Sequence, residues 1–174
     1  RNAFNEIFTC IDELHLQNIK GVFHCFTGNK SDAKKRKKKY DSEKSDVVIA
    51  VDYGHGLITP PIVEFLENKS RFLAVNTQLN ASNIDYHSIS KYHSAEYICI
   101  HEGELRHDYR NRTDSVENLV TDLSERIKTD IIVITRGKAG SLAYMNNNFF
   151  YCPAFASKIV DRVGAGDTLL AITS

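Results

Sequence analysis

Asp167 stands directly after three residues with little or no side chain, Gly164, Ala165 and Gly166, and directly before an apolar run. Backbone N–H groups beside such small residues can approach a ligand closely, and a helix that begins here adds further unpaired N–H groups with partial positive charge. A carboxylate in the first turn could take the proton from a hydroxyl that attacks a bound phosphoryl group. We therefore predict an anion hole with Asp167 as general base; an ordinary tight turn is the alternative that the same composition allows.

A second pair of polar residues, Asp52 and His55, ends the β-branched run of residues 46–52 and enters a glycine-rich turn. Such a run predicts a buried strand, and open α/β sheets bind ligands at the carboxyl ends of their strands. The two side chains are therefore candidates for a substrate-binding loop. A capped loop that holds no ligand is the alternative interpretation.

Strand-like and helix-like segments alternate along the chain, which is typical of a parallel sheet with covering helices. Three consecutive asparagines, residues 146–148, separate two strand-like runs and predict a hairpin at the edge of the sheet. We expect a three-layer α/β fold with a mostly parallel sheet and this edge hairpin. The expected helices are 3–17, 59–69, 115–128 and one from about Gly166 onward, and the expected parallel strands are 21–26, 46–52, 71–76, 96–100 and 130–137.

Length and composition limit the class of protein. A chain of 174 residues with 42% hydrophobic residues suits one domain or part of one. The 22 basic and 22 acidic side chains cancel, so the net charge gives no argument for a nucleic-acid partner. No apolar run approaches the ~20 residues that cross a bilayer. The 4 cysteines form no CxxC pair, so we expect buried thiols in a reducing compartment, the cytoplasm.

Three segments together resemble the ribokinase-like (PfkB) carbohydrate kinase family, and most closely its heptose-kinase branch. They are VVIAVDYGHGLITP, VITRGKAGSLAY and DRVGAGDT, and their order and spacing match the family over about residues 44–174. The resemblance implies a ribokinase-like fold and ATP-dependent phosphate transfer to a hydroxyl of a sugar or sugar phosphate. ATP and Mg²⁺ are the implied cofactors, with a monovalent cation in some members.

The resemblance also implies roles for residues around the nucleotide. Asp167 matches the catalytic base, and residues 164–166 match the anion hole. Thr135 and Gly137 match the positions that approach the nucleotide phosphates. The usual threonines before GAGD are replaced by Arg162 and Val163, so this part of the motif departs from the family.

Two acidic residues match cation-binding positions of the family. Asp161 falls where some members hold a monovalent cation. Glu104 matches the acidic residue of the family's N-x-x-E motif, which arranges Mg²⁺ and phosphate through water. In this chain His101 replaces the asparagine of that motif, so this motif departs from the family.

The first 35 residues resemble a different family, the TatD-type metal-dependent deoxyribonucleases, through the segment GVFHCFTG. His24 falls on a metal ligand of that family, so metal-dependent phosphodiester hydrolysis is an alternative function, and a packed histidine is the plainer interpretation. The basic run of residues 34–39 predicts an exposed linker, with nucleic-acid contact as its alternative.

We therefore expect three parts, a hydrolase-like segment 1–35, a basic linker 36–44 and a partial ribokinase-like kinase domain 45–174. The amino-terminal half of the family's fold, with most of its sugar-binding residues, has no counterpart in this sequence, so we expect an incomplete kinase. A non-catalytic remnant that binds nucleotide is a further alternative. Strand edges left open by missing strands would favour self-association.

Overall fold

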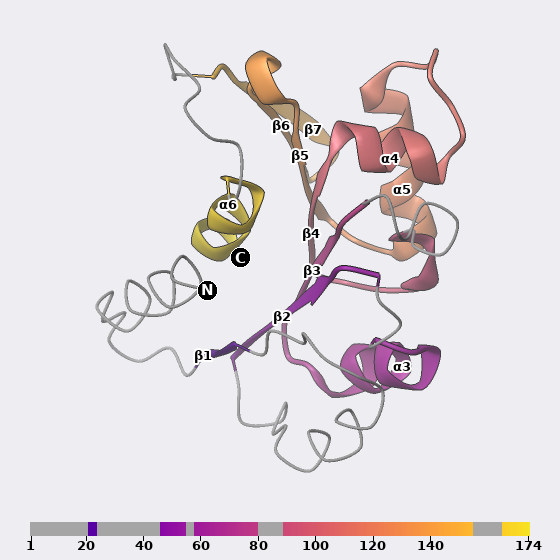
Figure 1. Cartoon of the computed structure of the whole chain (residues 1–174), viewed down its shortest axis with the longest axis vertical. Coiled ribbons are helices and arrows are strands. Elements are labelled where there is room, and N and C mark those ends of the chain that lie inside the picture. Colours follow the sequence, from indigo (N-terminus) through magenta and orange to yellow (C-terminus); the bar gives the residue numbers. More distant parts are fainter. Residues whose placement is uncertain (1–20, 24–45, 55–57, 80–88, 155–164) are drawn as a thin grey trace.

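A seven-stranded sheet forms the centre of the computed structural model, which describes residues 21–23, 46–54, 58–79, 89–154 and 165–174 (Figure 1). The strands follow one another across the sheet in chain order. β1 to β5 are parallel, and β6 and β7 continue the sheet in antiparallel pairing. The strands are β1 Gly21–Phe23, β2 Val47–Asp52, β3 Leu73–Thr77, β4 Tyr97–His101, β5 Ile131–Thr135, β6 Ser141–Met145 and β7 Asn148–Cys152.

Helices cover both faces of this sheet, so the expected three-layer, mostly parallel α/β fold is confirmed. α3, α4 and α5 lie on one face and α6 lies on the other (Figure 1). Two short 3₁₀ turns stand in the connections after β3 and β5. The helices are α3 Pro60–Lys69, α4 Glu102–Asp108, α5 Val116–Ile127 and α6 Ala165–Thr173, and the 3₁₀ turns are η2 Ile89–Lys91 and η3 Gly137–Ala139.

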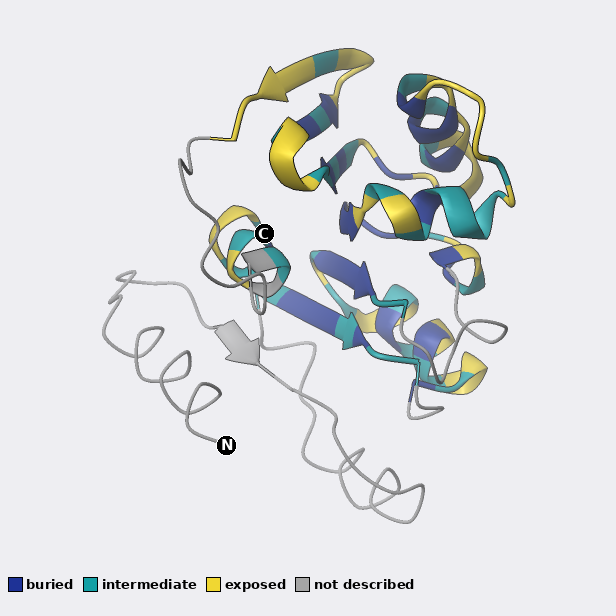
Figure 2. Cartoon of the chain, turned by 45° about the horizontal axis from the view of Figure 1, so that its top comes forward, coloured by how far each residue is buried: buried dark blue, intermediate teal, exposed yellow. Residues whose placement is uncertain are grey.

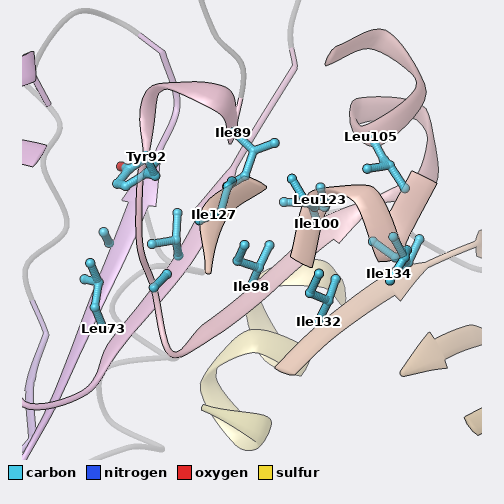
Figure 3. Packing of buried hydrophobic residues seen from close by; sticks show 14 of the residues in the cluster. Leu73, Ile89, Tyr92, Ile98, Ile100, Leu105, Leu123, Ile127, Ile132 and Ile134 are labelled. Atoms are coloured by element: carbon cyan, nitrogen blue, oxygen red, sulfur yellow. The ribbon is translucent and has the colours of Figure 1, made fainter. Parts of the chain in front are cut away.

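Burial on both faces explains why the central strands are nearly continuous apolar runs. In β2, Val48 and Ala50 belong to the core under α3 to α5, whereas Ile49 belongs to the core under α6. Successive side chains of a strand point to opposite faces, so each strand supplies both cores. Figure 3 shows the larger core, in which Ile98 and Ile132 pack beside residues of the helices.

α5 shows how the sequence sets the limits of a helix. Its buried residues recur at helical spacing and give one apolar face: Val116, Leu119, Val120, Leu123 and Ile127. The Ser115 hydroxyl accepts a hydrogen bond from the Asn118 N–H at 3.2 Å, which caps the amino end. Lys128 ends the helix in a left-handed conformation. α3 begins where expected, with Pro60 and Pro61 in its first turn, but the Thr59 side chain makes no capping hydrogen bond.

The predicted edge hairpin is present. Asn146 and Asn147 connect β6 to β7 with φ angles of 50° and 63°, which suits a type I′ turn that matches the twist of the two strands. β7 is the last strand of the sheet, and most of its residues are exposed (Figure 2). The expectation that the cysteines are buried holds for Cys99 and is wrong for Cys152, because Cys152 lies on this outer strand.

β1 pairs in parallel with β2 and so belongs to the same sheet as the strands that follow. The strand expected at residues 21–26 is thus present over Gly21–Phe23. The helix expected at residues 3–17 and the basic linker lie outside the described residues, and the three-part division of the chain stays a prediction. Among the helices of the described residues, none has the length and apolar character needed to cross a membrane.

Gly140 and Gly137 provide a matched pair for a stability test of the β5–β6 connection. A Cβ on Gly140 would lie 2.0 Å from the Cys152 carbonyl oxygen, and the residue has a φ of 84°. A Cβ on Gly137 meets nothing within 4 Å, although its φ of 57° is also left-handed. We predict that Gly140→Ala lowers the free energy of unfolding by more than about 3 kcal/mol, because strain and overlap add. Gly137→Ala should cost about 1 kcal/mol.

Urea unfolding followed by circular dichroism measures both variants. Equal losses in the two variants would show that the close approach of Gly140 to the hairpin does not limit stability.

Candidate functional site

The carboxyl ends of the parallel strands form the edge at which the sequence predicts a site. Asp52 at the end of β2 pairs with Thr77 at the end of β3. His101 at the end of β4 pairs with Thr135 at the end of β5. Because parallel pairing aligns these ends, the loops that follow the four strands leave the sheet on one side. Open parallel sheets bind ligands at this side.

α6 is attached to the sheet by its carboxyl end and its apolar side. Thr173, its last residue, forms a hydrogen bond with the hydroxyl of Tyr97, which opens β4. Leu170 is buried in the core with Ala74 and Cys99. Nine helical residues span ~12 Å, so the first turn of α6 lies about that far along the helix from the contact with Tyr97. The first turn of a helix has unpaired N–H groups with partial positive charge, so the start of α6 is the end that suits an anion.

The predicted helix start at the GAGD segment is confirmed, since α6 begins at Ala165. Gly166 and Asp167 therefore lie in its first turn, where a carboxylate is favoured by the helix dipole. The side chains of Ala165 and Asp167, and the whole of Gly164 and Asp161, are outside what the structure describes. The roles of these residues stay predictions.

Glu104 lies in the first turn of α4 and contacts the backbone on two sides. One carboxylate oxygen accepts a hydrogen bond from the His101 N–H at 2.6 Å, and the other accepts one from the Leu79 N–H at 3.2 Å. His101 completes a capping box, because its Nδ1 accepts from the Gly103 N–H at 2.9 Å. The histidine that stands in place of the family's asparagine thus caps α4. A carboxylate can accept several hydrogen bonds at once, and the water-mediated contact of Glu104 to Mg²⁺ stays a prediction.

Glu102 joins the two segments expected to surround the nucleotide. Its carboxylate accepts a hydrogen bond from Arg136 Nε at 2.9 Å and another from Arg106 Nε at 2.8 Å. Arg136 stands between Thr135 and Gly137, so this pair ties the β5–β6 connection to the start of α4. Burial raises the pKa of Glu102, but the hydrogen bonds from the two arginines outweigh it and the pKa is lowered overall. The carboxylate is therefore charged at neutral pH.

Asp52 is buried at the end of β2 and has several partners. One oxygen accepts a hydrogen bond from the Gly54 N–H at 3.0 Å. The other accepts one from the Tyr92 hydroxyl at 3.1 Å and forms an ion pair with Lys91. His55, the second residue of the predicted substrate loop, is outside the described residues.

No group of three metal-ligating side chains occurs within the part of the chain that the structure describes. His24, the candidate ligand of the alternative hydrolase, lies outside that part. Mg²⁺ commonly binds through one or two carboxylates together with substrate phosphates and water.

Comparison with known proteins decides the family. The model of the pfkB family of carbohydrate kinases matches residues 67–172, which is more than half of the chain. This chain belongs to the pfkB carbohydrate kinase family. The match spans the strands β3 to β7 and reaches into α6, so it includes the Glu104 turn, the segment of residues 135–137 and Asp167.

Curated relatives of this pfkB family chain include two bacterial proteins named "Bifunctional protein HldE". The protein from Aliarcobacter butzleri is 28% identical over 165 residues, which cover 92% of this chain and 31% of the relative. The protein from Geotalea uraniireducens is 26% identical over 138 residues, or 77% of this chain and 28% of the relative. The chain thus spans about a third of the length of these relatives. The alignment with the Aliarcobacter butzleri protein covers more residues of this chain than the segment 36–174 contains. It therefore includes part of the first 35 residues.

Solved structures confirm the ribokinase-like fold of this family member. Phosphofructokinase-2 from Escherichia coli in complex with potassium has a TM-score of 0.65 at 13% identity, over 86% of this chain and 50% of that protein. Ribokinase from Thermotoga maritima has a TM-score of 0.54 at 18% identity, over 83% of this chain and 47% of that protein. The chain therefore corresponds to about half of a complete kinase of this fold.

Several residues of this edge were not found from the sequence. α4 was not predicted, although the acidic residues after β4 suit the first turn of a helix. Asp52 has two partners, Lys91 and Tyr92, which are 39 and 40 residues away along the chain. A separation of this size leaves no pattern in the neighbouring sequence from which the contact could be predicted. The pairing of Glu102 with Arg136 is equally remote.

Glu102→Gln tests the link between the two nucleotide-side segments through the pH dependence of stability. Because the folded-state pKa of Glu102 is lowered, its stabilisation is present above the ordinary value of about 4.5 and is lost as pH falls through the lower folded value. We predict that thermal stability of the variant falls less steeply than that of the unsubstituted chain below pH 4.5. Differential scanning calorimetry between neutral and acid pH measures this.

Glu125→Gln is the matched control, because Glu125 is exposed on α5. It should leave the acid limb unchanged. Parallel acid limbs in all three proteins would contradict the ion-pair role of Glu102.

Proposed function

We propose that this chain carries the nucleotide side of an ATP-dependent kinase that transfers phosphate to a hydroxyl of a sugar or sugar phosphate. Membership of the pfkB carbohydrate kinase family, with Asp167 in the first turn of α6, is the observation that supports it. The likeness of the sequence to the heptose-kinase branch of the family favours a heptose phosphate as the acceptor. ATP in the cytoplasm is the proposed phosphate donor.

In the proposed reaction, Asp167 takes the proton from the acceptor hydroxyl. The hydroxyl oxygen then forms a bond to the γ-phosphorus of ATP, the bond from that phosphorus to the bridging oxygen breaks, and ADP leaves with the electron pair. The backbone N–H groups at the start of α6 stabilise the charge on the transferred group. Gly164 directly precedes the helix, and Ala165 is its first residue. Small residues suit this place because a side chain would keep the phosphate away from the backbone.

Thr135 and Gly137 would approach the nucleotide phosphates from the end of β5. The Arg136–Glu102 pair holds this segment against α4, so the two residues are presented from a fixed connection. Glu104 would contact Mg²⁺ through water, and the ion would neutralise charge on the phosphates. Asp161 is the proposed ligand of a monovalent cation.

Asp167→Asn should reduce phosphate transfer ~10²–10⁴-fold, because the amide cannot accept the proton. Nucleotide affinity should remain within about threefold, since the backbone N–H groups are retained. The test measures ADP release by a coupled assay with ATP, Mg²⁺ and a panel of hexose and heptose phosphates, and nucleotide affinity by calorimetry. Asp130→Asn is the matched control, because Asp130 is exposed at the amino edge of β5 and should leave turnover unchanged.

Unchanged turnover in Asp167→Asn would disprove the assignment of the base. One alternative is a non-catalytic remnant that binds nucleotide. Nucleotide binding without any turnover in the unsubstituted chain would support that alternative.

We also propose that β7 allows self-association. It is the last strand of the sheet and carries no charged residue, and Phe150 and Tyr151 are 52% and 61% exposed. Uncharged, exposed edge strands pair readily with other strands. Sedimentation velocity should show concentration-dependent dimers, and Phe150→Lys should shift the population to monomers. A monomer at every concentration would contradict the proposal.

A further inference from the structure

The outer strand β7 lacks the features that usually prevent an edge strand from pairing with another chain. Natural edge strands are commonly protected by charged side chains, by proline or by a bulge. Pairing of β7 with β6 is regular over all its residues, so no bulge interrupts it. None of these residues is charged, and none is proline: Asn148, Phe149, Phe150, Tyr151 and Cys152. Among the described residues, no strand lies beyond β7 in the sheet.

The turn of the β6–β7 hairpin determines which backbone groups of β7 face outward. Met145 and Asn148 pair across a two-residue turn, and residues in this position exchange backbone hydrogen bonds. Hydrogen-bonded and non-hydrogen-bonded pairs alternate along antiparallel strands. The first, third and fifth residues of β7 therefore direct their N–H and C=O groups toward β6. Phe149 and Tyr151 direct theirs away from β6, toward the outer edge.

Pro153 limits this outer edge at its carboxyl end. It directly follows the last residue of β7 and occupies the position at which the next outward N–H would fall. Proline has no N–H to donate. A strand that pairs with the outer edge of β7 therefore finds donors at only two residues, Phe149 and Tyr151.

The outward groups of β7 complement those of β7 in a second copy of the chain. If the two strands run antiparallel about a two-fold axis at Phe150, Phe149 of each copy faces Tyr151 of the other. Every outward N–H then has a C=O acceptor on the opposite strand. An axis at Phe149 or at Tyr151 would use only half of these donors within the two strands. The backbone of β7 therefore favours one register, and a two-fold axis is the commonest symmetry of protein dimers.

The side chains on both faces of β7 suit the same register. On one face, Phe150, which is 52% exposed, would lie opposite Phe150 of the second copy (Figure 2). On the other face, Tyr151 is 61% exposed, and its hydroxyl donates a hydrogen bond to Glu117 of α5 at 2.8 Å. Phe149 lies on that face too, with its ring centroid 5.0 Å from that of Tyr144. Each Phe149 would meet Tyr151 of the other copy, and aromatic pairs across strands stabilise a sheet.

We propose that two copies of this chain join their sheets through β7, in antiparallel pairing centred on Phe150. This inference rests on the self-association of β7 proposed above, and it adds the partner strand, its direction and its register. The two sheets are then continuous across the two-fold axis, and the outer edge of β7 is covered in both copies.

Introduced cysteines test the register on the whole chain under mild oxidation with glutathione. With Cys152→Ser present, Phe150→Cys should form a disulfide between two copies, because directly opposed Cβ atoms lie about 4.5–5.5 Å apart, close to what a disulfide spans. Phe149→Cys in the same background is the matched control, and it should cross-link roughly tenfold less or weaker still, since its opposite residue is Tyr151. Asn148→Cys should cross-link to the native Cys152 of the other copy. Mass spectrometry of the linked peptides identifies each pair.

Sedimentation velocity separates backbone pairing from contact between side chains. Tyr151→Pro removes an outward N–H and leaves the groups that face β6 in place, so it should raise the dissociation constant of the dimer roughly tenfold or more. Tyr151→Phe keeps the N–H and loses the hydroxyl, so it should change that constant less than about threefold. Circular dichroism checks that both variants are folded, and the cysteine pairs decide the register if Tyr151→Pro does not fold.

The possible results distinguish the register from the association itself. Dimers that cross-link through Phe149→Cys as readily as through Phe150→Cys would overturn the register and leave self-association in place. Dimers that Tyr151→Pro leaves unchanged in affinity would overturn pairing through the backbone of β7. A monomer at every concentration would contradict both the register and the self-association on which it rests, and the kinase assay of Asp167→Asn is independent of either result.

Discussion

Parallel pairing of β2 to β5 is the constraint on which the rest of the structure depends. It requires each strand to be buried on both faces, and the sequence meets this with short apolar runs in which alternate residues enter different cores. It also brings the ends of four strands to one edge, with Asp52 opposite Thr77 and His101 opposite Thr135. Residues that are far apart in the sequence therefore become neighbours at this edge through the strand pairing alone.

The carboxylates at that edge stabilise loops, and this structural role is separate from any chemical role. Glu104 accepts hydrogen bonds from N–H groups at the end of β4 and in the segment after β3, and Glu102 holds the segment after β5. The Asp52 carboxylate contacts Gly54 after β2 and Lys91 before β4. Described parts of the connections on this side are therefore held to one another by carboxylates. Preorganisation of this kind is what an active site needs, because donors already in place do not reorganise during the reaction.

Sequence reasoning succeeded where the signal was local. The strands at 46–52 and 130–137, the helix capped by Ser115, the asparagine turn and the helix at GAGD all have short patterns that depend on a few neighbouring residues. It failed where a role depends on distant partners. Nothing near Lys91 in the sequence indicates an ion pair with Asp52, and nothing near Cys152 indicates that its strand would be the outermost one. The roles of Thr135 and Gly137 come from the resemblance to the family, and these roles and that of Asp167 stay predictions.

The central claim is that the start of α6 and the segment after β5 together bind nucleotide phosphates. Calorimetric titration of the chain with ATP and Mg²⁺, and in parallel with adenosine, tests it most directly. Because the proposed contacts are backbone N–H groups aimed at phosphate, ATP should bind at least tenfold more tightly than adenosine. Equal affinities for the two ligands, or no detectable binding of ATP, would contradict the claim.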